Sequence, residues 1–340
     1  MAPARGGRPL SRWKGVPVLV TGAQGFLGAW LAERLLDEGA KVVTLLRDVE
    51  PEARFNTDGI AERCVHVRSD LTDYDGLTRA LNEHDVRAVF HLAAQTIVGT
   101  ANRSPLSTYE TNIRGTYTLL EACRGFGVVN GRIDRIVVAS SDKAYGRHEQ
   151  LPYQEDFPLQ PSYPYDVSKA ATDMIARSYA ITYDMPVAVT RLANIYGGGD
   201  LNRSRIIPDT IQALLEGNSP VIRSDGSPER DYLYVEDAVG AYLAVSDSLD
   251  ERENWGSAWN AGHGAPHSVR DVVDRLIAIS GKDIEPDVQG QGTPHGEIDR
   301  QFLDSAAIKS ELGWEPRWSL DEGLRATWEW YAAGGSRQPR

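Results

Sequence analysis

The chain has 340 residues, of which 41% are hydrophobic and 25% are charged, a balance typical of a globular protein and not of a disordered or fibrous one. Its formal net charge of -12, and the absence of an apolar run of membrane-spanning length, lead us to expect neither a nucleic-acid nor a membrane partner. Cys64 and Cys123 lack the spacing of a disulfide framework or a metal motif, which favours reduced thiols, a cytoplasmic protein and no bound metal.

A strand, a glycine turn and a helix are predicted in succession near the N-terminus. Residues 1–13 are basic, rich in glycine and proline and without an apolar signal core, so we expect a flexible tail there. The apolar residues 16–20 predict a buried parallel strand, and a helical apolar pattern follows the glycines. This order indicates a dinucleotide site, in which glycines permit a tight turn and close approach to a pyrophosphate. The cofactor contacts that we expect in this turn are Gly22, Gln24, Gly25, Phe26, Leu27 and Gly28.

The end of the second predicted strand bears on the choice of cofactor. That strand, at residues 42–46, ends at Arg47 and Asp48. An acid about 20 residues after the glycine turn bonds the adenosine ribose hydroxyls, so we predict NAD as the cofactor. Arg47 leaves NADP open, because an arginine here could accept a 2′-phosphate. After the next strand, Asp70 and Leu71 are predicted to flank the adenine, although Asp70 could equally cap the following helix.

A tyrosine and a lysine carry the predicted chemistry. Tyr165 and Lys169 lie four residues apart in residues 163–184, whose pattern predicts a helix with both side chains on one face. Free tyrosine has a pKa of about 10, and a nearby ammonium and the positive nicotinamide would lower that pKa. A strand before the pair, at residues 135–139, leads to Ser141, whose hydroxyl can bridge a substrate oxygen and the phenol. We therefore predict Ser141, Tyr165 and Lys169 as catalytic residues.

Together these motifs give the chain a resemblance to a known family. It resembles the extended short-chain dehydrogenase/reductases of the nucleotide-sugar epimerase/dehydratase type over roughly residues 14–331. The resemblance implies an α/β fold with a Rossmann-type doubly wound parallel sheet and a smaller mixed α/β substrate-binding lobe. The motifs that carry it lie, in order, at residues 21–28, 91–95, 111–112, 140–141, 165–169, 191–197, 230–237 and 312–316.

The resemblance also implies how the chain is divided and what it binds. We expect residues 14–192 mainly in the dinucleotide-binding lobe, with later strands returning to it, and residues 193–331 mainly in the nucleotide-sugar-binding lobe. Residues 332–340 are expected to form a second flexible tail. Relatives commonly dimerise through the helix with the Tyr-Lys pair and the one before it, here about residues 106–124, which implies a homodimer. Further cofactor contacts are implied at Leu92, Ala93, Ala94, Gln95 and Asn112.

The residues after Ser141 indicate which reaction the family resemblance favours. Simple 4-epimerases usually carry small or apolar residues there, and thymidine-diphosphoglucose dehydratases carry an Asp-Glu pair. The pair here is Asp142-Lys143, which is similar to CDP-glucose 4,6-dehydratases, as are residues 197–200 and 205–209. The resemblance implies that C4 of the sugar is oxidised first. Asp142 would then act as the acid at C6, and Lys143 as the base at C5 or as a stabiliser of the enolate there, before hydride returns to C6.

Other functions stay open at this point. A UDP-hexose or UDP-hexuronate 4-epimerase would share the site without needing Asp142 or Lys143, and the pair also fits an ordinary solvated loop. A non-catalytic, cofactor-binding regulatory protein is a third class, but such proteins often lose the tyrosine or the lysine.

The last third of the chain supplies most of the predicted contacts with a nucleotide-diphosphate sugar. A planar guanidinium can hold phosphate oxygens in pairs, and arginines there must overcome a negative background. A surface salt bridge is the alternative for each arginine. The substrate contacts that we expect are Gln95, Ser141, Asn194, Arg205, Arg230, His295 and Glu297.

Overall fold

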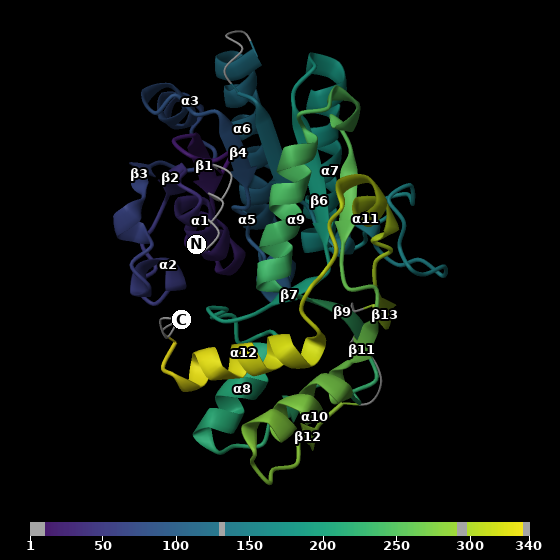
Figure 1. Cartoon of the computed structure of the whole chain (residues 1–340). Helices are drawn as coiled ribbons and strands as arrows, with labels where there is room; N and C mark the ends of the chain where they lie inside the picture. The colour runs from purple at the N-terminus through teal and green to yellow at the C-terminus, as the bar shows by residue number, and fades with distance from the viewer. Residues whose placement is uncertain (1–10, 129–132, 291–297, 336–340) are drawn as a thin grey trace, which may run out of the picture.

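Seven parallel strands form the central sheet of the computed structural model, which describes residues 11–128, 133–290 and 298–335. Their order is β10-β6-β5-β4-β1-β2-β3, so the order reverses between β1 and β4, the place where such sheets bind ligands. The predicted Rossmann-type doubly wound fold is therefore confirmed (Figure 1). The strands are β1 (Pro17–Thr21), β2 (Lys41–Leu46), β3 (Val65–Arg68), β4 (Ala88–His91), β5 (Arg135–Ala139), β6 (Val187–Leu192) and β10 (Ala258–Ala261).

Helices cover both faces of this sheet, because its central strands are apolar on both sides. In β4, Val89 packs toward the face covered by α3, α6 and α7, and Phe90 packs toward the face covered by α1 and α9. Successive side chains of a strand point to opposite faces, so one short strand supports both cores. The covering helices are α1 (Phe26–Asp37), α3 (Tyr74–Glu83), α6 (Gly115–Cys123), α7 (Pro164–Tyr183) and α9 (Val235–Ser248).

A smaller sheet lies next to the carboxyl ends of the large one. In this small sheet β9 pairs with β7 and β13 in parallel and with β11 antiparallel, and β8 and β12 form a separate parallel pair. The helices α8, α10 and α12 pack beside these strands (Figure 1). The elements are β7 (Asn194–Tyr196), α8 (Ile206–Glu216), β8 (Val221–Ile222), β9 (Glu229–Tyr234), β11 (Pro266–Ser268), α10 (Val269–Ser280), β12 (Asp287–Val288), β13 (Arg300–Gln301) and α12 (Leu320–Ala332).

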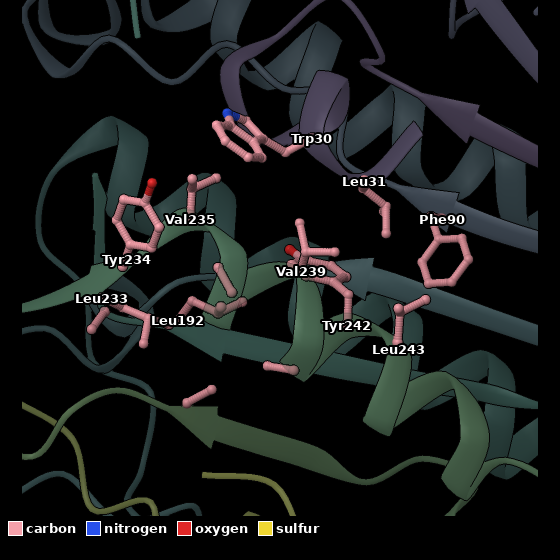
Figure 2. Packing of buried hydrophobic residues seen from close by; sticks show 14 of the residues in the cluster. Trp30, Leu31, Phe90, Leu192, Leu233, Tyr234, Val235, Val239, Tyr242 and Leu243 are labelled. Atoms are coloured by element: carbon pink, nitrogen blue, oxygen red, sulfur yellow. The ribbon is translucent and has the colours of Figure 1, made fainter. Parts of the chain in front are cut away.

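One hydrophobic core runs from the large sheet into the small one. Figure 2 shows side chains of α9, among them Val239 and Tyr242, lying near Trp30 and Leu31 of α1. Leu233 of the small sheet belongs to the same buried cluster. Because the chain passes from β9 through α9 to β10 and back to β11, the two sheets are built from interleaved segments.

Short helical elements occupy several connections. The predicted helix at residues 106–124 is divided by a π-helical turn, whereas the predicted helix at residues 163–184 matches α7 closely. The short elements are α2 (Arg54–Thr57), η1 (Ala61–Arg63), α4 (Val98–Arg103), α5 (Pro105–Tyr109), η2 (Glu110–Arg114), η3 (Arg124–Val128), η4 (Asp142–Tyr145), η5 (Arg252–Asn254) and α11 (Ala306–Leu312).

The packed part of the chain extends slightly into both predicted tails. Trp13 is only 3% exposed, and its ring lies 5.8 Å from that of Phe90, so the indole belongs to the core and not to a tail that ends at residue 13. Ala332 is the last residue of α12. The hydrophobic area of the indole accounts for its burial, which the surrounding basic and glycine-rich composition concealed.

Candidate active site

The glycine turn packs so closely against its surroundings that only glycine fits at two of its positions. Gly22 adopts a φ of +75°, and a Cβ there would lie 2.7 Å from the Ala93 nitrogen. A Cβ on Gly28 would lie 2.0 Å from the Gly22 oxygen, so only glycine lets α1 pack against the turn. Gly25 is the N-cap of α1, and no side chain of the described residues caps this helix end. Its first N–H groups therefore remain available for an anion.

Gln24 connects the glycine turn to the loop after β2. Its side-chain nitrogen donates to the Asp48 oxygen at 2.6 Å, and its side-chain oxygen accepts from the Glu50 nitrogen at 2.9 Å. Asn56 donates to the same oxygen at 3.2 Å. Gln24 thus has protein partners, and its contacts bring the ends of β1 and β2 together at the side of the sheet where a dinucleotide would lie.

Charged groups meet at the ends of β2 and β3. Arg47 Nε and Asp48 Oδ2, which directly follow β2, form an exposed ion pair at 2.6 Å. Burial alone would raise the pKa of Asp70, but hydrogen bonds from Thr72 and the charge of Arg47 lower it overall. Asp73, and not Asp70, is the N-cap residue of α3. Leu71 is buried in the core on the α3 side of the sheet.

The segment after β4 is held against α7 by Asn112. Its side-chain oxygen accepts from the Gln95 nitrogen at 2.7 Å, and its side-chain nitrogen donates to the Gln95 oxygen at 3.0 Å and to Ser168 Oγ at 2.9 Å. The Ala93 nitrogen donates to Thr21 Oγ1 at 3.2 Å. Asn112, predicted as a cofactor contact, therefore fixes the course of residues 92–95 beside the glycine turn.

Tyr165 and Lys169 both lie on the buried side of α7, near its N-terminus. Pro164 occupies the first turn, where a missing N–H costs no hydrogen bond. Lys169 Nζ donates to the Ala139 oxygen at 2.9 Å, at the end of β5. Burial lowers the pKa of Lys169 to about 8, and burial, with the nearby Lys169 charge, lowers the pKa of His91 to about 3. The imidazole is thus neutral beneath the ammonium.

The pKa of Tyr165 departs from the sequence-based expectation. Burial raises it above its usual value, and the nearby carboxylates Asp142 and Asp166 raise it further. Arg205 and a hydrogen bond with Ser141 act in the opposite direction. In the protein alone burial and the two carboxylates outweigh these opposing effects, and the lowering expected from the sequence depends on the positive nicotinamide as well as on Lys169.

The residues after β5 form a short turn that buries a carboxyl group. Ser141 is the N-cap of η4: its Oγ accepts from the Lys143 nitrogen at 3.2 Å and donates to Asp142 Oδ1 at 2.9 Å. Asp142 is only 2% exposed, and its Oδ2 has no hydrogen-bond partner among the residues that the structure describes. Burial raises its pKa despite the opposing effects of Lys143, Ser141 and Arg230. Asp142 is therefore not a solvated loop residue, and burial shifts the pKa of its carboxyl group above the usual value.

Two of the predicted substrate residues act electrostatically on this cluster. Arg230, on β9, is buried and affects the pKa of Asp142, and its Nη1 donates to the Glu229 oxygen at 2.8 Å. Arg205, next to α8, affects the pKa of Tyr165 and is held by Asp200 Oδ2 at 2.8 Å and by the Ile195 oxygen at 2.7 Å.

The other substrate candidates take less part in this cluster. Asn194 begins β7 and is half-buried. Gln95 Oε1 accepts from the Ile97 nitrogen at 2.7 Å. His295 and Glu297 lie outside the described residues.

Sequence reasoning did not assign a buried ion pair behind the site. Arg191 on β6 is 1% exposed, and its Nε donates to Asp173 Oδ2 at 2.7 Å. Two features of the sequence could have indicated this pair. They are an acid four residues after Lys169 on the same predicted helix and an arginine inside an apolar strand. Within the described ranges, no cluster of three or more potential metal ligands occurs and no helix is long and apolar enough to span a membrane.

Comparison with known proteins identifies the family. Residues 19–327 match the family model described as GDP-mannose 4,6 dehydratase. The chain belongs to this family. It is 30% identical over 335 residues to CDP-glucose 4,6-dehydratase of Salmonella typhimurium, which covers 94% of this chain and 92% of that protein. It is 32% identical over 319 residues to UDP-glucose 4-epimerase of Mycolicibacterium smegmatis, with 92% and 97% covered.

Solved structures divide between the same two kinds of enzyme. UDP-glucose 4-epimerase of Thermotoga maritima aligns with a TM-score of 0.84 at 29% identity, covering 94% of this chain and 99% of that one. dTDP-glucose 4,6-dehydratase of Bacillus anthracis, solved in complex with NAD, aligns with a TM-score of 0.81 at 29% identity, covering 94% and 97%. The predicted family is therefore confirmed as that of nucleotide-sugar dehydratases and epimerases.

Proposed function

We propose that the protein is a nucleotide-sugar 4,6-dehydratase. The observation that carries the proposal is Asp142, a buried carboxyl group whose pKa is raised, next to Lys143 and close enough to Tyr165 to affect its pKa. A carboxyl group near the phenol, with a pKa raised above its usual value, suits the acid that elimination at C6 requires, and epimerisation at C4 needs no such acid. The similarity to the CDP-glucose and dTDP-glucose 4,6-dehydratases supports this choice.

NAD is the proposed cofactor, and the glycine turn fits it. The Cβ positions at Gly22 and Gly28 are blocked by backbone atoms, and the open N-terminus of α1 offers N–H groups to a pyrophosphate. Related structures solved in complex with NAD support this choice of cofactor. Arg47 is the residue that would favour NADP, so Arg47→Ala should leave NAD binding nearly unchanged in fluorescence titrations and weaken NADP binding, with Arg63→Ala as an exposed control.

The chain's own residues would carry out the proton transfers of the reaction. Tyr165 would take the proton of the C4 hydroxyl, with Ser141 hydrogen-bonded to the same oxygen and Lys169 below the phenol. The bound dinucleotide would supply hydride acceptance from C4 and later hydride return to C6. Asp142 would donate its proton to the departing C6 hydroxyl while Lys143 removes the C5 proton, so that water leaves. Once hydride has returned to C6, Lys143 would give a proton back to C5, and NAD is regenerated by that hydride return.

A panel of nucleotide sugars tests this function. CDP-, dTDP-, UDP- and GDP-hexoses are incubated separately with the protein, and the products are identified by NMR and mass spectrometry. One of them should give a 4-keto-6-deoxy sugar that has lost one water, with no net change in NAD. A product changed only by inversion at C4 would instead establish the alternative function.

That alternative is a UDP-hexose or UDP-hexuronate 4-epimerase, which the similarity to UDP-glucose 4-epimerases favours. Turnover in deuterium oxide separates the two, because elimination exchanges the C5 proton with solvent and epimerisation does not. Tight NAD binding without turnover of any sugar would favour a regulatory protein instead.

We also propose that the protein is a homodimer. Apolar side chains are exposed along one group of helices: Leu106 on α5 (72% exposed), Tyr117 on α6 (43%), and Met174 (61%), Ile181 (76%) and Tyr183 (44%) on α7. Large exposed apolar groups on adjoining helices are typical of a subunit interface. Ile181→Glu should convert a dimer to a monomer in light scattering, whereas Val49→Glu, on another exposed apolar residue, should not.

A further inference from the structure

A buried hydrogen-bond network surrounds Tyr145, the last residue of η4. Its side chain is fully buried, and its hydroxyl accepts from Arg191 Nη1 at 2.8 Å and donates to Asn260 Oδ1 at 2.8 Å. Arg191 on β6 and Asn260 on β10 are register partners on neighbouring strands, so their side chains leave the sheet on the same face. Two strands therefore hold one phenol oxygen from two sides.

Arg191 connects this phenol to α7. Its Nε and Nη2 donate to the two carboxylate oxygens of Asp173 at 2.7 Å and 3.0 Å, a bidentate pair in which both residues are buried. Asp173 follows Lys169 by four residues on α7, so the two side chains share one side of the helix. One guanidinium thus contacts both the helix that carries Tyr165 and the turn that carries Asp142.

The geometry of η4 makes Tyr145 important for the position of Asp142. A 3-10 turn has three residues per turn, so residues i and i+3 lie on the same side. The side-chain hydrogen bond of Asp142 is to the adjacent Ser141, which belongs to the same short segment. Gly146 follows with a φ of +72°, and a Cβ there would lie 2.2 Å from the Gln160 oxygen, so only glycine fits at the end of this turn. Tyr145 therefore lies on the same side of the turn as Asp142, and its hydroxyl joins that side to β6 and β10.

The same network fixes the loop that follows the turn. Asn260 Nδ2 donates to the Tyr153 oxygen at 3.0 Å, and Arg191 Nη1 donates to the Glu155 oxygen at 2.9 Å. Glu155 Oε1 accepts from the Asn260 nitrogen at 3.0 Å. Burial raises the pKa of Tyr145 to about 12, so its hydroxyl keeps the proton that it donates.

We propose that Tyr145 is a positioning residue for the elimination step: through its two strand partners it holds η4 so that Asp142 and Lys143 face C6 and C5 of the sugar while Tyr165 faces C4. This inference rests on the proposed dehydratase function. Without the hydroxyl, Tyr165 would stay in place on α7, but η4 would lose the hydrogen bonds that join Tyr145 to Arg191 on β6 and Asn260 on β10. Water loss should then slow while C4 oxidation continues, and reduced cofactor should accumulate.

Tyr145→Phe tests this with the hexose that the panel identifies as substrate. Its ring packing is preserved, and rapid mixing follows reduced cofactor by absorbance and product by quenching and mass spectrometry. We expect water loss to slow by about tenfold to a hundredfold relative to hydride transfer, because small misplacements of reacting groups slow a reaction by this order. Tyr242→Phe is the matched control: Tyr242 is equally buried, its hydroxyl bonds Thr190, and it lies on α9.

The outcomes separate this inference from the proposed function. If the unmodified protein dehydrates its substrate and Tyr145→Phe shows no accumulation of reduced cofactor, or slows both steps equally, the positioning role is wrong. If the unmodified protein only inverts C4, the dehydratase proposal itself fails. Should Tyr145→Phe not fold, Asp173→Asn gives the second test. It weakens the ion pair that holds the Arg191 guanidinium beside Tyr145, so it should also slow water loss more than hydride transfer.

Discussion

The two pairs of proposed catalytic residues are held in different ways. Tyr165 and Lys169 lie on the 20-residue helix α7, where backbone hydrogen bonds set their spacing. Asp142 and Lys143 lie on the four-residue turn η4, which is attached to the sheet through side chains from other segments. The helical pair depends on local structure, whereas the turn pair depends on contacts that are remote in sequence. The predictions below test this difference, from the largest expected effect to the smallest.

Removing the proposed base should have the largest effect. Tyr165→Phe keeps the ring on α7 but removes the group that accepts the C4 proton, so hydride transfer should fall by about 10³-fold to 10⁴-fold. Single-turnover absorbance of reduced cofactor measures this step. Tyr179→Phe, on the same helix with its hydroxyl 3.2 Å from Glu121 Oε2, should retain normal rates. Normal hydride transfer in Tyr165→Phe would refute the assigned role.

The turn pair should affect a later step. Asp142→Asn and Lys143→Ala should both spare C4 oxidation, because neither side chain is needed to remove the C4 proton. Formation of the 4-keto-6-deoxy product should fall by on the order of 10²-fold. Asp156→Asn, an exposed acid in the following loop, serves as the control. Equal loss of both steps in either catalytic variant would contradict separate roles for the two pairs.

Substitutions at two glycines of the same turn should separate an effect on protein stability from an effect on NAD binding. Gly28→Ala places a methyl group 2.0 Å from the Gly22 oxygen and should cost about 1–3 kcal/mol of stability as well as NAD affinity. Gly25→Ala meets the same oxygen at 3.2 Å with an ordinary φ of -70°, so it should weaken NAD binding with little change in stability. Denaturant unfolding and fluorescence titration measure the two quantities; equal loss of stability in both variants would count against the distinction.

The environment beneath Lys169 predicts a pH dependence of stability. Burial lowers the folded-state pKa of His91 to about 3, whereas an unfolded histidine has a pKa of about 6.5. The unfolded state therefore binds one more proton between these values. The contribution of His91 is fully present above about pH 6.5 and is lost as pH falls through the window toward 3, by up to about 1.4 kcal/mol per pH unit.

The variant His91→Gln isolates this contribution. Asp231 acts with the opposite sign, because burial raises its pKa to about 6 and its contribution is lost as pH rises through that value. The difference in unfolding free energy between the protein and His91→Gln cancels the Asp231 term. That difference should shrink as pH falls from 7 to 4; a difference independent of pH would show that the imidazole is not held neutral.

Much of the large sheet could be predicted because its signals are local. Apolar strands, the spacing of Gly22, Gly25 and Gly28, and the four-residue interval from Tyr165 to Lys169 each act within one or two turns of backbone. The burial of Trp13 could not be predicted in the same way. It depends on Phe90, which lies on a strand far along the chain.

The sequence by itself determined several strands of the large sheet, the glycine turn, the helix with Tyr165 and Lys169, and the family, because these depend on residue types at short, fixed intervals. Only the tertiary structure decided that the Asp142 carboxyl group is buried and that the pKa of Tyr165 is raised. It alone brought Tyr145, Arg191 and Asn260 together. Burial and long-range hydrogen bonds depend on which segments fold against one another, and that information is not carried by any single stretch of the chain.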